Sequence, residues 1–155
     1  GSIVVGPREG RFASSDPWRF APHNVPHVVF GTVLLWFGWY GFNGGSTLSM
    51  ASETDARTAV MVTLNTSLGA GAGGLVGVLL HFTRTGKFDV PASCNGVLSG
   101  LVGITAGCAA VSPASALAIG ALASFFCDIF TILLLRWGID DPVGAFPVHG
   151  IGGAW

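Results

Sequence analysis

Three long stretches without a charged residue constrain this sequence more than any other feature. No Asp, Glu, Lys or Arg occurs in residues 20–52, 58–83 or 90–127 of the 155-residue chain. About 20 consecutive apolar residues are enough for a helix to cross a bilayer, so the third stretch has room for two passes. Only 10% of the residues are charged, against about a quarter in soluble domains. The sequence therefore predicts an all-α integral membrane protein that has the lipid bilayer as its solvent.

The apolar parts of the chain divide into five expected membrane segments. We place them at about 27–47, 57–81, 93–112, 114–136 and 143–155. Ser112 and Pro113 mark a sharp turn between the third and the fourth segment. The fifth segment has only about 13 residues, too few to cross a bilayer, and the chain begins with Gly1 rather than Met. We therefore expect residues 1–155 to be a single partial domain of a longer protein.

The basic residues predict the orientation of these segments, because cytoplasmic loops carry an excess of Lys and Arg. Of the seven basic residues, all but Arg57 flank the start of the first segment, the end of the second and the end of the fourth. These three places lie on one side of a five-pass path. The first segment is therefore expected to begin inside the cell and to end outside it, near Ser46.

Two residues at the outer end of the first segment are candidates for binding a cation. Phe42 and Ser46 are four positions apart, so they share one face of a helix. An aromatic ring attracts a cation through its quadrupole, and a hydroxyl oxygen accepts an N–H. Together they could select a small cation that carries N–H groups. In the structural alternative, Phe42 packs against a neighbour and the Ser46 hydroxyl bonds to its own backbone.

His149 is the second candidate site. It lies in the fifth segment, within a glycine-rich apolar stretch that has no charge. An ionisable side chain inside a membrane is a functional candidate by default, because protein contacts must replace the hydration it loses. Imidazole has an unperturbed pKa of about 6.5, and its two nitrogens can donate and accept at once, which suits proton relay. We expect His149 to face a conduit and to have a partner elsewhere in the protein.

No pattern in the sequence indicates a metal or a cofactor. The three cysteines have neither C-x-x-C spacing nor nearby histidines, and we expect them to be small buried hydrophobes. Residues 69–74 satisfy G-x-G-x-x-G, but a nucleotide-binding loop follows a strand, whereas this run lies inside a chargeless segment. Gly69, Gly73 and Gly77 recur at every fourth position, which favours close helix packing instead.

Three stretches of the chain carry a resemblance to a known family. They are FGTVLLWFGWYGFNGGS at 30–46, GKFDVPASCNGVLSGLVGITAGC at 86–108 and DDPVGAFPVHGIGG at 140–153. These stretches resemble the ammonium transporter family, Amt/Mep/Rh, and most of all its Amt branch. The family fold has eleven helices, in which helices one to five and six to ten are inverted repeats, and it forms a homotrimer with one pore per subunit. The resemblance implies that this chain is the second half of that fold, from helix six to the start of helix ten.

The resemblance implies roles for four residues. Phe42 matches the phenylalanine that gates the pore, and Ser46 matches the serine of the outer ammonium-recruitment site. His149 matches the second member of the twin-histidine pair that lines the pore. Asp141 matches an acidic position near the inner mouth, with a structural or proton-path role. The other pore histidine belongs to the half that this chain does not contain.

The function that the resemblance implies is ammonium transport across the plasma membrane. The cation is recruited outside and deprotonated, and ammonia and a proton then pass through the histidine-lined pore, because an unpaired charge is costly in a low-dielectric passage. The expected partners are ammonium or ammonia and the bilayer, with no nucleic acid, metal or cofactor, and the chain is not expected to be an enzyme. Two alternatives remain open. One is an ammonium sensor of the same family with little transport, and the other is an intramembrane hydrolase that uses Ser46 and His149.

Overall fold

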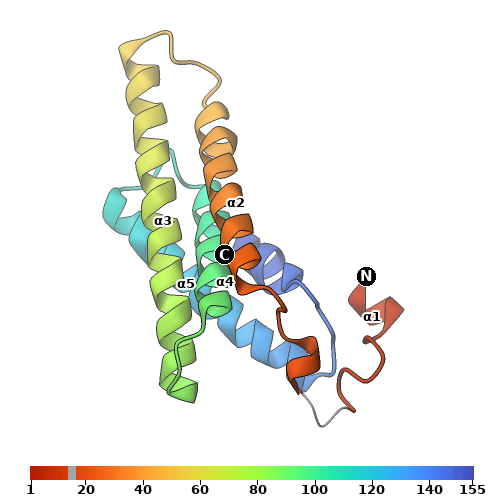
Figure 1. Ribbon diagram of the computed structural model, residues 1–155. Helices are drawn as coiled ribbons and strands as arrows, with labels where there is room; N and C mark the ends of the chain where they lie inside the picture. The colour runs from red at the N-terminus through yellow and green to blue at the C-terminus, as the bar shows by residue number, and fades with distance from the viewer. Residues whose placement is uncertain (14–16) are drawn as a thin grey trace.

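Four long helices form the body of the molecule. The computed structural model describes residues 1–13 and 17–155, in which every regular element is a helix. The long helices are α2 (Val25–Gly45), α3 (Glu53–Thr85), α4 (Val90–Thr105) and α5 (Pro113–Arg136). Short elements precede and follow them, namely α1 (Ser2–Val5), η1 (Pro17–Phe20), η2 (Phe146–Ile151) and α6 (Gly152–Ala154). Figure 1 shows that the α2–α3 connection and the α3–α4 connection lie at opposite ends of the bundle. We call the end that carries Arg84 and Lys87 the basic end, and the opposite end the Ser46 end.

Three of these helices, α2, α3 and α5, are long and apolar enough to cross a membrane, whereas α4 is shorter. The expected third segment, 93–112, differs most from the observed helix, which ends at Thr105. The side-chain amide of Asn65 donates to the carbonyl oxygens of Cys108 and Val111, both at 2.9 Å. Carbonyls held by a side chain of α3 do not need a further helical turn to satisfy them, so the chain turns toward α5 early.

Side-chain caps explain where the helices begin. Ser52 and Asp55 form a capping box at the start of α3, in which each side chain accepts the other residue's backbone N–H. Asp89 caps α4 and Ser112 caps α5, and each is followed by a proline in the first turn, where its missing N–H costs nothing. The turn predicted at Ser112 and Pro113 is therefore the first turn of α5.

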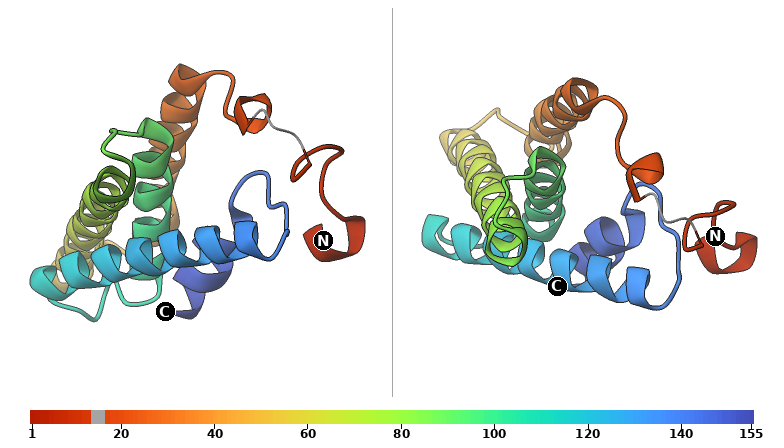
Figure 2. Two further views of the ribbon diagram at one scale, coloured as in Figure 1. Left: turned by 90° about the horizontal axis from the view of Figure 1, so that it is seen from below. Right: turned by 60° about the horizontal axis from the view of Figure 1, so that its bottom comes forward.

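Glycines let α3, α4 and α5 approach one another closely. A Cβ at Gly73 would collide with the carbonyl oxygen of Gly96, and a Cβ at Gly96 would collide with that of Gly73. Gly120 of α5 lies in the same way against the backbone of Gly69. In lipid, small residues at such crossings allow backbones to pack without side chains between them. Helix α4 contacts α2, α3, α5 and η2, and Figure 2 shows α5 crossing α3 and α4 steeply.

The fifth segment, expected at 143–155, forms helical turns from Phe146 to Ala154 and begins as a π-helix. The N–H of Val148 bonds to the carbonyl of Gly144 at 3.1 Å, while Pro147 has no N–H to donate. Single π-helical turns are wider than α-helical ones and occur often at functional sites. His149 therefore lies in an irregular helical turn that packs on α4 and α5.

Candidate functional site

Phe42 and Ser46 lie together at the C-terminal end of α2. The Phe42 ring is 62% exposed and meets the Trp39 ring edge-on, with 6.0 Å between the ring centroids. The Ser46 hydroxyl is exposed and donates to the backbone carbonyl of Phe42 at 2.5 Å. This is the backbone bond of the structural alternative for Ser46, but Phe42 is not packed into the core. Because its hydrogen is engaged, the Ser46 oxygen keeps its lone pairs free to accept an N–H beside the ring.

Side-chain hydrogen bonds fix the helix that carries Phe42. They join Trp39 to Thr105 at 2.8 Å, Tyr40 to Ser67 at 2.9 Å and Asn43 to Thr66 at 3.0 Å. The first bond leads to α4 and the other two to α3, so α2 is held at two neighbouring helices. These partners were not predicted from the sequence. The sequence feature that points to them is the presence of hydroxyl and amide side chains inside uncharged segments, because a polar group buried there needs a hydrogen-bond partner.

An apolar hollow of about 320 Å³ runs along α2 next to Phe42. Its walls are Leu34, Leu35, Gly38, Trp39 and Phe42. An ion that enters a surface of this kind loses hydration that the apolar side chains cannot replace, which costs free energy. A neutral solute pays a much smaller desolvation cost. The exposed ring of Phe42 therefore stands between the Ser46 hydroxyl and an apolar surface.

His149 is exposed on η2. Among residues 1–13 and 17–155, no side chain or carbonyl forms a hydrogen bond with its ring. Its backbone is well anchored, because the His149 carbonyl accepts the N–H of Gly152, and the adjacent Pro147 and Val148 are buried. Helices α2 and η2 make no close contact, so this chain by itself does not bring His149 together with Phe42 and Ser46.

The separation of His149 from Ser46 also bears on the hydrolase alternative. A nucleophile and its base must lie within hydrogen-bond reach. In the structure the Ser46 hydroxyl bonds to Phe42, and the helix that carries it does not touch η2. The described chain therefore does not form a Ser–His pair from these two residues.

Two consecutive aspartates lie before η2 and have different partners. The Asp141 carboxylate accepts the backbone N–H of Phe146 at 2.8 Å, so it caps the first turn of η2. The Asp140 side chain is only 3% exposed and forms an ion pair with Arg8 at 2.7 Å. Hydrogen bonds from Arg8 hold the pKa of Asp140 at about 2, below its usual range. Asp141 was a candidate from the sequence but Asp140 was not, because nothing local links Asp140 to an arginine 132 positions away.

A polar hollow of about 320 Å³ lies at the basic end between α3, α4 and α5. An ion pair between Arg84 and Asp128 joins α3 to α5 beside it. Asp128 lies in an otherwise chargeless part of α5, and this partner explains how its charge is tolerated there. The Ser124 hydroxyl also faces this hollow, is 2% exposed and has no hydrogen-bond partner within the described residues.

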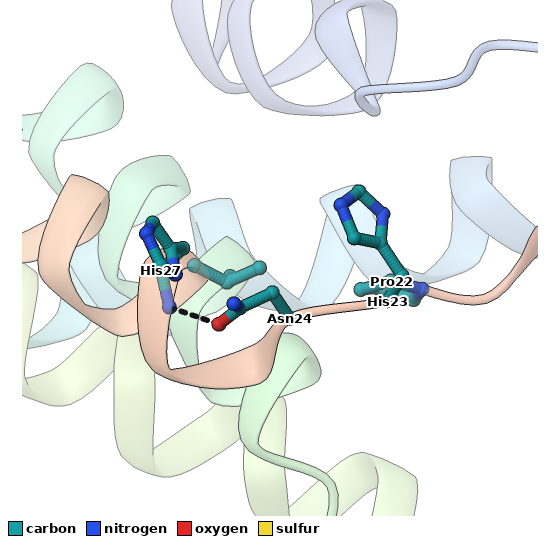
Figure 3. A pocket seen from close by; sticks show the side chains of 5 residues that line it. Pro22, His23, Asn24 and His27 are labelled. Atoms are coloured by element: carbon teal, nitrogen blue, oxygen red, sulfur yellow. Dashed lines mark hydrogen bonds between the residues drawn. The ribbon is translucent and has the colours of Figure 1, made fainter.

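A third hollow, of about 390 Å³, lies at the start of α2. Pro22, His23, Asn24, His27 and Val28 line it, as Figure 3 shows. Asn24 caps α2 by accepting the N–H of His27 at 3.0 Å. The two imidazoles are exposed and stand apart in Figure 3. Over the part of the chain that the structure describes, no three His, Cys, Asp or Glu side chains are grouped as a metal site would require.

Comparisons with known proteins agree on one family. The chain matches the profile of the Ammonium Transporter Family over residues 1–155. It is 44% identical over 154 residues to ammonium transporter Amt2 of Archaeoglobus fulgidus, covering 99% of this chain and 32% of that protein. Against ammonium transporter 1 of Schizosaccharomyces pombe it is 43% identical over 152 residues, which is 98% of this chain and 29% of that protein.

Solved structures give the same result. Mep2 of Saccharomyces cerevisiae superposes with a TM-score of 0.78 at 38% identity, covering 85% of this chain and 30% of that one. A structure described as a sensor Amt protein superposes with a TM-score of 0.83 at 35% identity, covering 98% of this chain and 37% of that one. The chain thus spans about a third of the length of the proteins it matches.

Proposed function

Because the chain belongs to the ammonium transporter family, we propose that the full-length protein carries ammonium across the plasma membrane. Within this chain, Ser46 and Phe42 recruit the cation at the outer face, and His149 acts in the pore. We further propose that the full-length protein is a homotrimer with a pore in each subunit. The membrane setting is supported by the three helices that are long and apolar enough to cross a bilayer.

The arrangement of Ser46 beside Phe42 is the observation that carries this proposal. The Ser46 hydroxyl gives its hydrogen to the Phe42 carbonyl, so its oxygen is available only as an acceptor. Ammonium can donate an N–H to that oxygen while its charge lies against the exposed ring, for a gain of about 0.5–2 kcal/mol from the ring. Potassium carries the same charge but has no N–H to donate. The site is therefore suited to discriminate between these two cations.

His149 is proposed to handle the proton that ammonium loses. Its ring is exposed and has no partner in the described chain, so it is available to another side chain of the full-length protein. The hollow beside Phe42 is apolar, which favours passage of neutral ammonia over the charged ion. An imidazole pair can take up the proton that ammonia leaves behind. Asp141 holds the first turn of the helix that carries this ring.

A sensing role is the second candidate, and the similarity to the sensor Amt protein supports it. In this role Ser46 and Phe42 are proposed to recognise ammonium in the same way. It differs in moving little of the ion. Measuring uptake and signalling in the same cells separates the two roles: uptake that sustains growth on limiting ammonium supports transport, and a signal without such uptake supports sensing.

Uptake kinetics test the recruitment site most directly. The full-length protein and its Ser46→Ala and Phe42→Leu variants are expressed in cells that lack their own ammonium transporters. Ser46→Ala is expected to raise KM by about three- to tenfold, the equivalent of one net hydrogen bond. Phe37 provides the control, because it is also a highly exposed phenylalanine of α2 but lies outside the hollow beside Phe42. Phe37→Leu should leave KM unchanged, and an unchanged KM in Ser46→Ala would contradict the proposed site.

A further inference from the structure

We propose that Arg8 and Asp140 are positioning residues for His149, an inference that rests on the transport function proposed above. Their ion pair fastens the connection between α5 and η2 to the segment that precedes α2. Because that connection leads directly into η2, the pair sets where the His149 ring stands. The two residues touch neither ammonium nor the proton, and they act through the backbone.

The contact between Arg8 and Asp140 is made at several points. The backbone N–H and the Nε of Arg8 donate to Oδ2 of Asp140 at 3.0 Å and 2.7 Å, and Nη2 donates to Oδ1 at 2.9 Å. Two-point pairing of a guanidinium with a carboxylate fixes direction as well as distance. Arg11 adds its Nε at 3.4 Å from Oδ1. Both oxygens of the buried carboxylate therefore have partners from the N-terminal segment.

An aromatic ring completes this cluster. The guanidinium carbons of Arg8 and Arg11 lie 5.1 Å and 5.3 Å from the centre of the Phe20 ring. A ring face attracts cations, so it helps two arginines to share one carboxylate. Phe20 comes shortly before α2, and the cluster therefore links the start of α2 to the end of α5.

The connection that carries Asp140 is stiff on both sides. Gly138, two residues after the end of α5, lies in the left-handed region with φ 70°, and the N–H of Ile139 bonds to the carbonyl of Leu134 at 2.9 Å. This is a Schellman ending, which fixes the direction in which the chain leaves the helix. On the other side, Asp141 caps Phe146. A displacement of Asp140 is therefore passed to η2 rather than absorbed in a loose loop.

The placement of His149 matters because proton transfer between rings depends strongly on distance. Reacting groups must be held within about 0.5 Å of their productive geometry. Loosening the Arg8–Asp140 pair should slow the step that involves His149. It should leave recruitment at Ser46 unchanged, because Ser46 lies at the opposite end of α2. The effect is thus expected in the maximal rate and not in KM.

The experiment uses the purified full-length protein in liposomes, where uptake is counted per folded molecule. Arg8→Lys keeps the charge but loses the two-point contact, and Asp140→Asn removes the charge of the partner. Both are expected to lower the maximal uptake rate by about tenfold with KM within twofold of wild type. The solvent deuterium isotope effect on uptake is expected to rise, because the proton step becomes limiting. A charge reversal, Arg8→Asp with Asp140→Arg, is expected to recover part of the rate lost in Arg8→Asp alone.

The matched control is Arg57→Gln. Arg57 forms an ion pair with Glu53 in which both side chains are more than three-quarters exposed, at 77% and 79%. The Arg57→Gln substitution should change neither the maximal uptake rate nor the isotope effect. A wild-type rate in Arg8→Lys, or a lowered rate with an unchanged isotope effect, would overturn the positioning role. If Asp140→Asn does not fold, Arg8→Lys decides the question. Failure of the transport function is a separate result, in which wild type gives no uptake or His149→Ala matches wild type.

Discussion

The indole N–H of Trp39 donates a hydrogen bond to the hydroxyl of Thr105, 2.8 Å away, and so ties α2 to α4. The same indole ring meets Phe42 edge-on. Trp39 is half-buried, and its ring cannot turn freely while this bond is in place. The Thr105 hydroxyl therefore restrains the Trp39 ring, and the Trp39 ring contacts the Phe42 ring beside the Ser46 hydroxyl.

Removing the Thr105 hydroxyl should loosen the position of the Phe42 ring without changing the volume of the side chain at position 105. Thr105→Val leaves the indole without its acceptor, at a cost of about 1 kcal/mol. We expect uptake by the full-length protein to discriminate less between ammonium and methylammonium, because the Phe42 ring gains freedom. Thr105→Ser retains the hydroxyl and should behave as wild type. Equal selectivity in the valine and serine variants would show that Trp39 does not govern Phe42.

The all-helical membrane fold and the family were predictable from sequence and are confirmed. Uncharged stretches long enough to cross a bilayer leave few alternatives to membrane helices, and the turn predicted at Ser112 and Pro113 lies at the start of α5. Both signals are local. They depend on residues that are neighbours in the chain.

The features that could not be predicted depend on residues far apart in the chain. Helix α4 ends at Thr105 because Asn65, on another helix, binds carbonyls beyond it. The Arg8–Asp140 pair likewise joins distant segments. The expected roles of Phe42, Ser46, His149 and Asp141 remain proposals, since no contact among the described residues tests them.

Asn65 provides a direct test of how the α4–α5 turn is held. Asn65→Leu leaves two carbonyl oxygens without their donor, and each unsatisfied buried group costs about 1–3 kcal/mol. We expect a clear fall in the thermal unfolding midpoint of the full-length protein in detergent. Thr63→Val is the control on the same helix, because the Thr63 hydroxyl bonds only to Ala59 of its own helix. An unchanged unfolding midpoint in Asn65→Leu would mean that Asn65 does not stabilise the turn between α4 and α5.

The glycine contacts predict that substitutions at Gly73 and Gly71 of α3 differ in their effect on stability. Gly73→Ala places a methyl group against the backbone of α4, whereas a Cβ at Gly71 meets nothing within 4 Å. Overpacking of this kind costs about 1–3 kcal/mol, and more where backbone must move. Gly73→Ala should lower the unfolding midpoint or the yield of folded protein, and Gly71→Ala should not. Equal behaviour of the two variants would contradict the close α3–α4 approach.

The low pKa of Asp140 predicts a dependence of stability on acid. Its folded pKa is about 2, against about 3.9 when unfolded, so its contribution is complete above about pH 5 and is lost as pH falls toward 2. We expect a contribution of about 1–2 kcal/mol, reduced from the full shift because Arg8 is 45% exposed. Unfolding midpoints between pH 7 and pH 3 should fall less steeply in Asp140→Asn than in wild type. Glu53→Gln removes an exposed ion pair, and its unfolding midpoint should depend on pH as that of wild type does.

The proposed role of His149 in transport is tested by ammonium uptake into liposomes, measured for the purified full-length wild-type protein and for His149→Ala. We expect specific uptake by wild type and a loss of at least about a hundredfold in maximal rate in His149→Ala, the lower end of the range for a positioned proton-transfer group. Binding at the outer site should persist, so KM changes little. Uptake by His149→Ala with the rate and selectivity of wild type would show that His149 does not carry the proton.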